Sequence, residues 1–185
     1  MRFSSFEIKE IIKAWIGVSL VFAIAMTGLK GLIVALPLAL LTGGIGFLLH
    51  EMAHKYVAQK YHCWAEFRAN NQALLIGLVL SFFGLILLAP GGVFIHGATK
   101  KQHGKIALAG PAMNIILAVL FYGLMRIGTW PIVAQYGFQI NSFLALFNLI
   151  PVFPFDGRTV WQWNKTAYLA TIALAGVLTF LSWHA

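Results

Sequence analysis

The chain has 185 residues, of which 60% are hydrophobic and only 10% are charged, and its mean hydropathy is +0.83. This composition excludes an ordinary soluble globular domain and indicates an integral membrane protein, because uncharged apolar stretches recur along the chain. The net charge of +8 is also common among nucleic-acid-binding proteins. No basic helix face or aromatic–basic interleaving accompanies it, so we expect a lipid bilayer as partner and no nucleic acid.

Five apolar segments are long enough to cross a bilayer, namely residues 11–29, 31–54, 106–125, 138–155 and 166–183. A sixth, 73–90, is interrupted by glycine and serine and closes on Pro-Gly-Gly. The predicted fold class is therefore an all-α polytopic membrane protein with about five to six transmembrane helices. Connections are short, so we expect a single intramembrane domain over residues 1–185 with no appended soluble domain.

The distribution of lysine and arginine indicates whether segment 73–90 crosses the membrane or turns back. If it crosses, the N-terminal side holds seven of the thirteen cations, which are Arg2, Lys9, Lys13, Lys55, Lys60, Arg68 and Arg126. If it turns back, that side loses Arg126 and gains Lys100, Lys101, Lys105, Arg158 and Lys165, which makes eleven against two. Because cytoplasmic loops carry the excess of positive charge, we predict a re-entrant hairpin, helical or β, between helices 31–54 and 106–125.

The motif His50-Glu51-Met52-Ala53-His54 closes the second apolar run, which otherwise lacks ionisable groups. Histidines at i and i+4 project from one helix face and can reach the same metal ion. The intervening glutamate is then placed to handle the proton of a water molecule at the metal. Because ionisable groups at membrane depth are costly without a partner or a function, this cluster predicts a zinc site with Glu51 as the catalytic residue.

A catalytic zinc usually takes three protein ligands, so the motif needs a third. Glu7 and Glu10 precede the first span, and we expect them to be solvated flanking charges. Asp156, the only aspartate in the chain, follows an apolar run with two prolines that would open the helix end and turn the side chain toward the bundle. Two alternatives remain, which are Glu66 as the ligand and an interfacial ion pair between Asp156 and Arg158.

Membrane depth favours Asp156 as the third ligand. Asp156 and His54 can share a metal ion only if they lie at the same depth. If segment 73–90 crosses the membrane, the two residues end at opposite faces, whereas a re-entrant hairpin places both on the basic side. The metal hypothesis and the charge distribution therefore select the same topology, with the site near the cytoplasmic side.

Three motifs follow one another along the chain: the HEMAH sequence, Ala109-Gly110-Pro111-Ala112-Met113-Asn114, and Asn148-x-x-Pro151 leading to Phe155-Asp156-Gly157. Together they resemble the site-2 protease family of intramembrane metalloproteases, and they cover nearly the whole chain. The resemblance implies one zinc ion per chain, held by His50, His54 and Asp156, with Glu51 as general base and acid. Phe155 departs from the family, in which leucine is commoner at this position.

The resemblance also implies roles outside the metal ligands. Asn114 and Asn148 would line the substrate path or support the transition state. Gly110 and Pro111 would let their helix approach closely, and a re-entrant β element would map onto part of residues 67–105. No PDZ or CBS module accompanies the motifs.

The function implied is hydrolysis of peptide bonds in or near the transmembrane segments of other membrane proteins, in a prokaryotic cell membrane. The competing hypothesis is a protein without catalysis, either a zinc-binding membrane scaffold or a small transporter. A transporter predicts several carboxylates along a path and two related halves. Here the carboxylates embedded in apolar sequence are Glu51 and Asp156, which the metal site needs, and no halves match.

Overall fold

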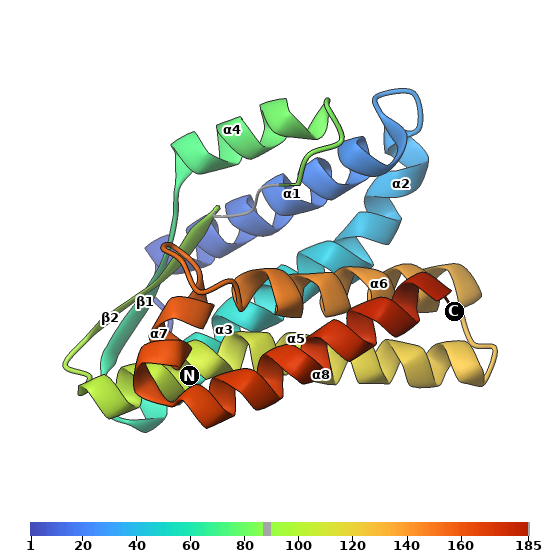
Figure 1. The fold of residues 1–185 in the computed structure, drawn as a ribbon. Helices are drawn as coiled ribbons and strands as arrows, with labels where there is room; N and C mark the ends of the chain where they lie inside the picture. Colours follow the sequence, from blue (N-terminus) through green and yellow to red (C-terminus); the bar gives the residue numbers. More distant parts are fainter. Residues whose placement is uncertain (87–89, 185) are drawn as a thin grey trace.

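Helices make up most of the fold, and one small sheet interrupts them (Figure 1). The computed structural model of the protein describes residues 1–86 and 90–184. In chain order the elements are α1 (Ser5–Thr27), α2 (Leu32–Ala39), the π-helical turn η1 (Leu40–Gly44), α3 (Ile45–Lys60), β1 (Trp64–Ala69), α4 (Asn71–Ser81), β2 (Gly91–His96), α5 (Lys100–Arg126), α6 (Pro131–Asn148), α7 (Asp156–Trp163) and α8 (Lys165–His184). A helix satisfies its own backbone hydrogen bonds, which suits a chain of this apolarity.

Four helical stretches in the described part of the chain are long and apolar enough to cross a bilayer: Ser5–Thr27, Leu32–Lys60, Lys100–Arg126 and Lys165–His184. They correspond to four of the five predicted spans. Helices α1 and α5 begin earlier than the predicted spans, because polar capping residues start each of the two before its apolar run begins. Ser4 caps α1 by accepting a hydrogen bond from the Glu7 amide, and Thr99 and Gln102 form a capping box at the start of α5.

The remaining predicted span, 138–155, has the wrong boundaries. Its helix, α6, begins at Pro131 and ends at Asn148. The helix stops there because Pro151 has no backbone N–H to donate and disfavours helical geometry in the residue before it. Among the described helices, α6 is not one of the four that are apolar enough to span, since Gln135, Gln139 and Asn141 interrupt its apolar sequence.

The segment between α3 and α5 leaves the bundle and returns to the same place. Strands β1 and β2 pair antiparallel with Ala69 opposite Gly91, and the Asn70 amide donates to the Pro90 carbonyl across 2.7 Å. The predicted hairpin 73–90 therefore starts and ends at neighbouring positions. Its first part is helical, because Asn70 caps α4 through the Ala73 amide, and its residues 87–89 lie outside the described residues.

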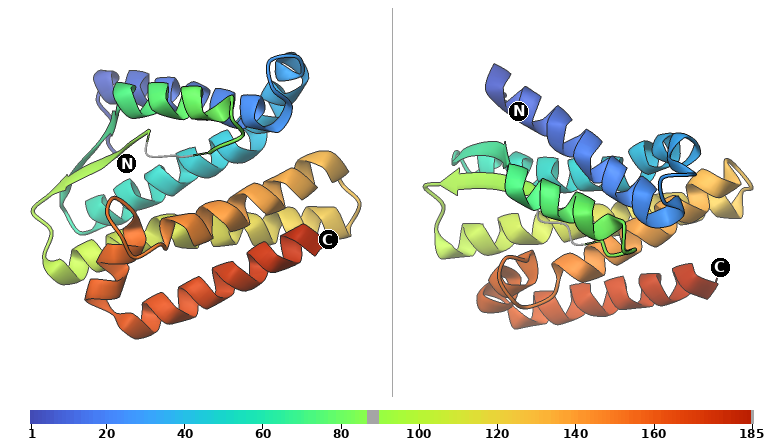
Figure 2. Two further views of the ribbon diagram at one scale, coloured as in Figure 1. Left: turned by 45° about the horizontal axis from the view of Figure 1, so that its top comes forward. Right: turned by 90° about the horizontal axis from the view of Figure 1, so that it is seen from above.

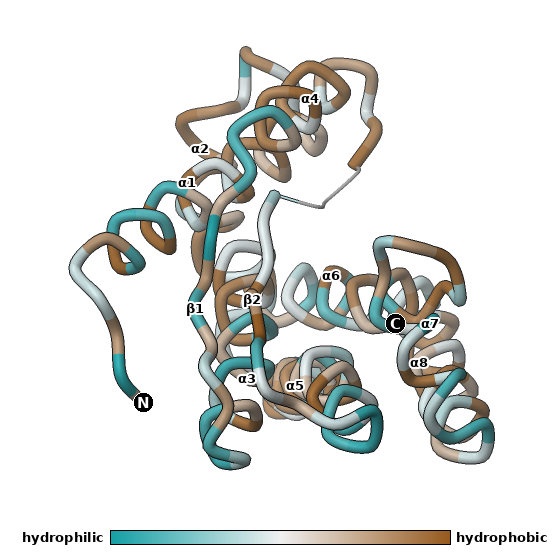
Figure 3. Tube along the Cα trace, turned by 90° about the vertical axis from the view of Figure 1, so that its left-hand side faces the viewer, coloured by the Kyte–Doolittle hydropathy of each residue, from teal (hydrophilic) through white to brown (hydrophobic). Residues whose placement is uncertain are grey.

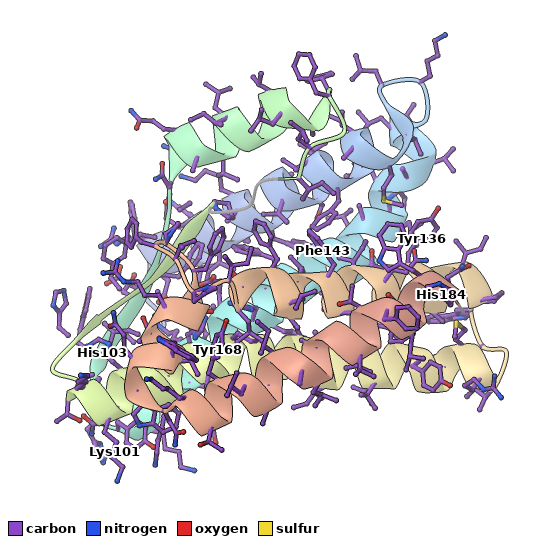
Figure 4. All side chains as sticks on the ribbon, viewed as in Figure 1. Lys101, His103, Tyr136, Phe143, Tyr168 and His184 are labelled. Carbon is purple, nitrogen blue, oxygen red and sulfur yellow. The ribbon has the colours of Figure 1, made fainter. Side chains whose placement is uncertain are left out.

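The core of the bundle is formed by α3, α5 and α6, with α7 and α8 packed on one side and α1, α2 and α4 on the other (Figure 2). Helix α4 and the later turns of α1 carry mostly apolar residues, whereas hydrophilic stretches occur at the start of α1, along the strands, at the start of α5 and around α7 and α8 (Figure 3). Lys101 and His103 lie at one end of the bundle, whereas Tyr136 and His184 lie at the other (Figure 4). The polar end is also the end where α3 finishes and α8 begins.

A buried ion pair joins α1 to α3 and to the sheet. Glu7 and Lys55 are each 1% exposed, and the Lys55 Nζ donates to both Glu7 carboxylate oxygens, at 2.6 and 2.8 Å. The same Nζ donates to the Ala65 carbonyl, and the Phe67 amide donates to Glu7 Oε1. The expectation of a solvated charge is therefore wrong for Glu7. Glu10 is partly exposed, and it pairs with Lys13 and accepts a hydrogen bond from the Ala69 amide of β1.

Breaking this pair from one side should destabilise the protein strongly. Lys55→Met leaves the Glu7 carboxylate buried without its cation, so we expect a loss of about 3–5 kcal/mol. The double variant Glu7→Gln/Lys55→Met removes the charge but keeps an acceptor for the Phe67 amide, and it should recover part of that loss. Thermal unfolding of the purified protein in detergent measures both. A double variant no more stable than Lys55→Met would contradict the role of the buried charge.

Candidate metal centre

The HExxH residues project from α3 into the interior of the bundle. His50, Glu51 and His54 are all buried, and their potential ligand atoms lie within 4.8 Å of one another. One helical turn separates the two histidines, so both imidazoles reach the same region, as the i, i+4 spacing predicts. These residues could therefore hold a metal ion.

The carboxylate of Asp156 joins this cluster from the first turn of α7. Its Oδ2 lies 3.1 Å from Nε2 of His50 and 3.2 Å from Nε2 of His54. Zinc–ligand bonds of about 2.0–2.1 Å in a tetrahedron place neighbouring ligand atoms about 3.3 Å apart. Both nitrogen–oxygen distances are close to that spacing, and two nitrogens with one carboxylate oxygen form a donor set typical of catalytic zinc.

The charge state of Asp156 also suits a metal ligand. Burial by itself would raise the pKa of this carboxyl group, but the imidazoles of His54 and His50 outweigh that effect and hold the pKa below its ordinary value. The side chain is therefore ionised at neutral pH, which is the form that binds a cation.

The two alternatives left open by the sequence do not match the geometry. Glu66 lies on β1, where its carboxylate pairs with Arg68 at 3.0 Å and accepts from the Ser4 hydroxyl. Among the described residues, Asp156 is paired with the two histidines and forms no ion pair with Arg158.

The end of α6 and the start of α7 pack closely enough to aim Asp156 at the histidines. Leu149, just past the end of α6, is fully buried. A Cβ added at Gly157 would collide with the Leu149 carbonyl, so only glycine allows the first turn of α7 to approach this closely. The short connection, with Pro151 and Pro154, thus returns the chain toward the bundle, as the sequence predicted.

Hydrogen bonds behind the histidines orient both rings. His50 Nδ1 lies 2.6 Å from Asn114 Oδ1, and His54 Nδ1 lies 2.7 Å from the Ile106 carbonyl oxygen. A carbonyl oxygen only accepts, so the His54 Nδ1 must carry a proton and donate it, which leaves Nε2 as the nitrogen directed at Asp156. This is the usual arrangement around a zinc-binding histidine, whose second nitrogen donates to a fixed acceptor.

A cavity of about 290 Å³ opens beside the cluster. Its wall includes the four predicted metal-site residues His50, Glu51, His54 and Asp156, the two predicted asparagines Asn114 and Asn148, and residues Gly91, Val93 and Ile95 of β2. The Glu51 Oε2 has no hydrogen-bond partner among the described residues. A buried, unpartnered carboxylate oxygen in a cavity is available for proton transfer.

The predicted asparagines occupy different places around this cavity. Asn114 is fully buried behind His50, with its amide nitrogen donating to the Gly46 carbonyl. Asn148 donates to the Leu144 carbonyl of its own helix and lines the cavity. Sequence reasoning missed Asn141, which contacts Asn114. The sequence could have indicated Asn141, because it is a polar residue two turns before Asn148 on the same face of a largely apolar helix.

Gly110 lets α5 approach the histidines. A Cβ at this position would collide with Nε2 of both His50 and His54, so we expect Gly110→Ala to abolish zinc binding. Gly123 on the same helix has nothing within 4 Å of the corresponding Cβ. Gly123→Ala should keep the wild-type zinc content and gain up to about 1 kcal/mol in helix stability. Metal analysis of the purified proteins tests both, and wild-type zinc in Gly110→Ala would refute the close approach.

Comparison with known proteins identifies relatives over almost the full chain. A protein of Methanocaldococcus jannaschii named "Putative zinc metalloprotease MJ0611" is 37% identical, with 97% of this chain and 96% of the relative aligned. Zinc metalloprotease MJ0392 of the same organism is 29% identical over 71% of this chain and 36% of its own length. The YwhC protein of Bacillus subtilis, also named as a zinc metalloprotease, is 28% identical over 68% of both chains.

No family model matches the chain, and no solved structure gives a significant match. The alignment with MJ0611 nevertheless covers 97% of the chain at 37% identity. The chain therefore belongs to the family of zinc metalloproteases that these archaeal and bacterial proteins represent.

Proposed function

We propose that the protein is an intramembrane zinc metalloprotease of the site-2 type, which hydrolyses peptide bonds in or near the transmembrane segments of other membrane proteins. The observation that carries this proposal is the convergence of Asp156 on His50 and His54, beside a cavity that contains the Glu51 carboxylate. This arrangement lies within a bundle in which four helices are apolar enough to cross a bilayer. One zinc ion per chain would be held by the three ligands.

The chemistry follows from the residues around the ligands. A bound zinc ion would polarise the scissile carbonyl and lower the pKa of a nearby water. Glu51 would take the proton of that water as general base and pass it to the leaving amine as general acid. Asn148, on the cavity wall, donates one of its two amide hydrogens to the Leu144 carbonyl, and the other would be free to donate to the substrate carbonyl. Asn114 already uses both of its amide hydrogens on Gly46 and Asn141.

The small sheet supports binding of an extended substrate. The outer edge of β1 is covered, because Phe67 and Ala69 donate to Glu7 and Glu10 and Ala65 accepts from Lys55. By the alternation of an antiparallel pair, the peptide groups of Gly91, Val93 and Ile95 on β2 point away from β1. All three residues line the cavity. A locally unwound substrate could therefore pair with β2 and bring a peptide bond beside Glu51.

The paired strands also support a re-entrant path for residues 70–90. Because β1 and β2 are neighbours, the end of α3 and the start of α5 lie at the same end of the bundle. Lysines 60, 100, 101 and 105 belong to that end, whereas Lys30 follows α1 at the other. With the positive-inside rule, this distribution supports a location of the catalytic cavity near the cytoplasmic side of the membrane.

Cysteine labelling tests this topology. In a Cys63→Ser background, Lys60→Cys and Lys101→Cys should react with an impermeant thiol reagent from the same side of the membrane. Lys30→Cys is the matched control and should react from the opposite side. Reaction of Lys60→Cys and Lys101→Cys from opposite sides would show that segment 70–90 crosses the membrane.

Activity and zinc content together test the catalytic assignment. Glu51→Gln should keep bound zinc but lose at least about a hundredfold in cleavage rate, because it removes the proton-transfer group. Asp156→Asn should lose zinc, and Glu66→Gln, which lies outside the site, should behave as wild type. The measurement is cleavage of a single-span membrane protein in reconstituted vesicles, with metal analysis of the same samples. Full cleavage by Glu51→Gln would rule out the proposed mechanism.

A further inference from the structure

A chain of buried amide groups connects α6 to the metal cluster. Asn141 and Asn114 are both fully buried among helices α3, α5 and α6. The Asn141 Nδ2 donates to the Gly137 carbonyl at 2.9 Å, and the Asn141 Oδ1 accepts from the Asn114 Nδ2 at 3.1 Å. Asn114 Oδ1 then faces Nδ1 of His50. This series of hydrogen bonds therefore begins at the Gly137 carbonyl and ends at the His50 imidazole.

The direction of each hydrogen bond in this chain is determined. The Gly137 carbonyl only accepts, so the Asn141 amide group must point toward it and the Asn141 oxygen must point toward Asn114. The Asn114 amide group meets two acceptors, the Gly46 carbonyl at 3.1 Å and the Asn141 oxygen. Its own oxygen must therefore face His50, and the His50 Nδ1 must donate.

This direction matters for metal binding. If the Asn114 carboxamide turned over, its amide group would face Nδ1 of His50 and the ring proton would move to Nε2. Nε2 is the atom that lies 3.1 Å from Asp156, and a protonated nitrogen has no lone pair for a metal. Asn141 supplies one of the two acceptors that prevent this rotation.

We propose that Asn141 is a positioning residue for His50, which it holds in the metal-binding tautomer by fixing the orientation of the Asn114 carboxamide. The proposal rests on the proposed function, because it takes His50 as a zinc ligand. Asn141 itself touches no ligand atom in the described structure. Asn141 also packs closely against α3, since a Cβ added at Gly46 would lie 2.5 Å from the Asn141 Oδ1.

Zinc affinity of the purified protein in detergent tests the proposal, measured by competition with a chelator of known affinity. Asn141→Leu keeps the branched shape of the side chain but removes the acceptor, and it should weaken zinc binding about tenfold, as loss of a group supporting a zinc-binding histidine does. Asn141→Asp, neutral when buried, can still accept from Asn114 and donate to Gly137, so it should stay near wild type. Ser142→Ala is the matched control, because Ser142 is buried beside Asn141 outside the chain of amides.

The absorption spectrum of the Co²⁺-substituted protein provides a readout that does not depend on catalysis or on global stability. The proposal expects the ligand-field bands of Asn141→Leu to differ from wild type and those of Asn141→Asp to match it. A purely structural role would lower the melting temperature of the metal-free protein and leave affinity and spectrum unchanged. If Asn141→Leu does not fold, Asn141→Ser, whose hydroxyl is too short to reach Asn114, carries the same test.

The outcomes separate this inference from the function on which it rests. Weaker zinc binding by Asn141→Leu, with recovery in Asn141→Asp, supports the positioning role. Wild-type affinity in Asn141→Leu, while His50→Ala loses zinc, overturns the role of Asn141 and leaves the metalloprotease assignment intact. Zinc binding that is unaffected by His50→Ala overturns the proposed site itself.

Discussion

Polar groups buried among apolar helices need partners, and this requirement organises the structure. Several deeply buried polar side chains in and near the metal centre have hydrogen-bond partners: Glu7 for Lys55, the Ile106 carbonyl for His54, and Asn114 for His50. Among the described residues, the buried side-chain atoms without a partner are Glu51 Oε2 and Ser142 Oγ. The carboxylate left unsatisfied is thus the one that the proposed chemistry needs free.

The same pattern distinguishes a catalytic centre from a structural zinc site. A structural site is closed by four protein ligands, whereas three ligands beside a cavity leave a position for water and substrate. Here two imidazole nitrogens and one carboxylate oxygen converge, and the cavity beside them contains Glu51. A zinc-binding scaffold would have no use for an unpartnered carboxylate at this position, since burying it costs free energy.

Helix α1 covers one edge of the small sheet and leaves the other edge beside the cavity. Glu7, Glu10 and Lys55 cover the free edge of β1 with side-chain hydrogen bonds. The exposed peptide groups are then those of β2, on the side of the cavity. The ion pair between Glu7 and Lys55 therefore has two effects. It anchors α1 to α3, and it occupies the edge of β1 that lies away from the cavity.

The sequence alone determined the features that depend on the local spacing of residues and on the small number of acidic residues. The i, i+4 spacing of His50 and His54 required both to share a helix face. Asp156, the only aspartate, was the favoured third ligand, but the structure was needed to exclude Glu66. Runs of apolar residues located four long helices, although capping residues set their true ends. Only the tertiary structure decided which polar residues meet across helices. Glu7 and Lys55 are separated by 48 residues and Asn114 and Asn141 by 27, and local periodicity carries no information about such contacts, because they depend on how whole helices pack.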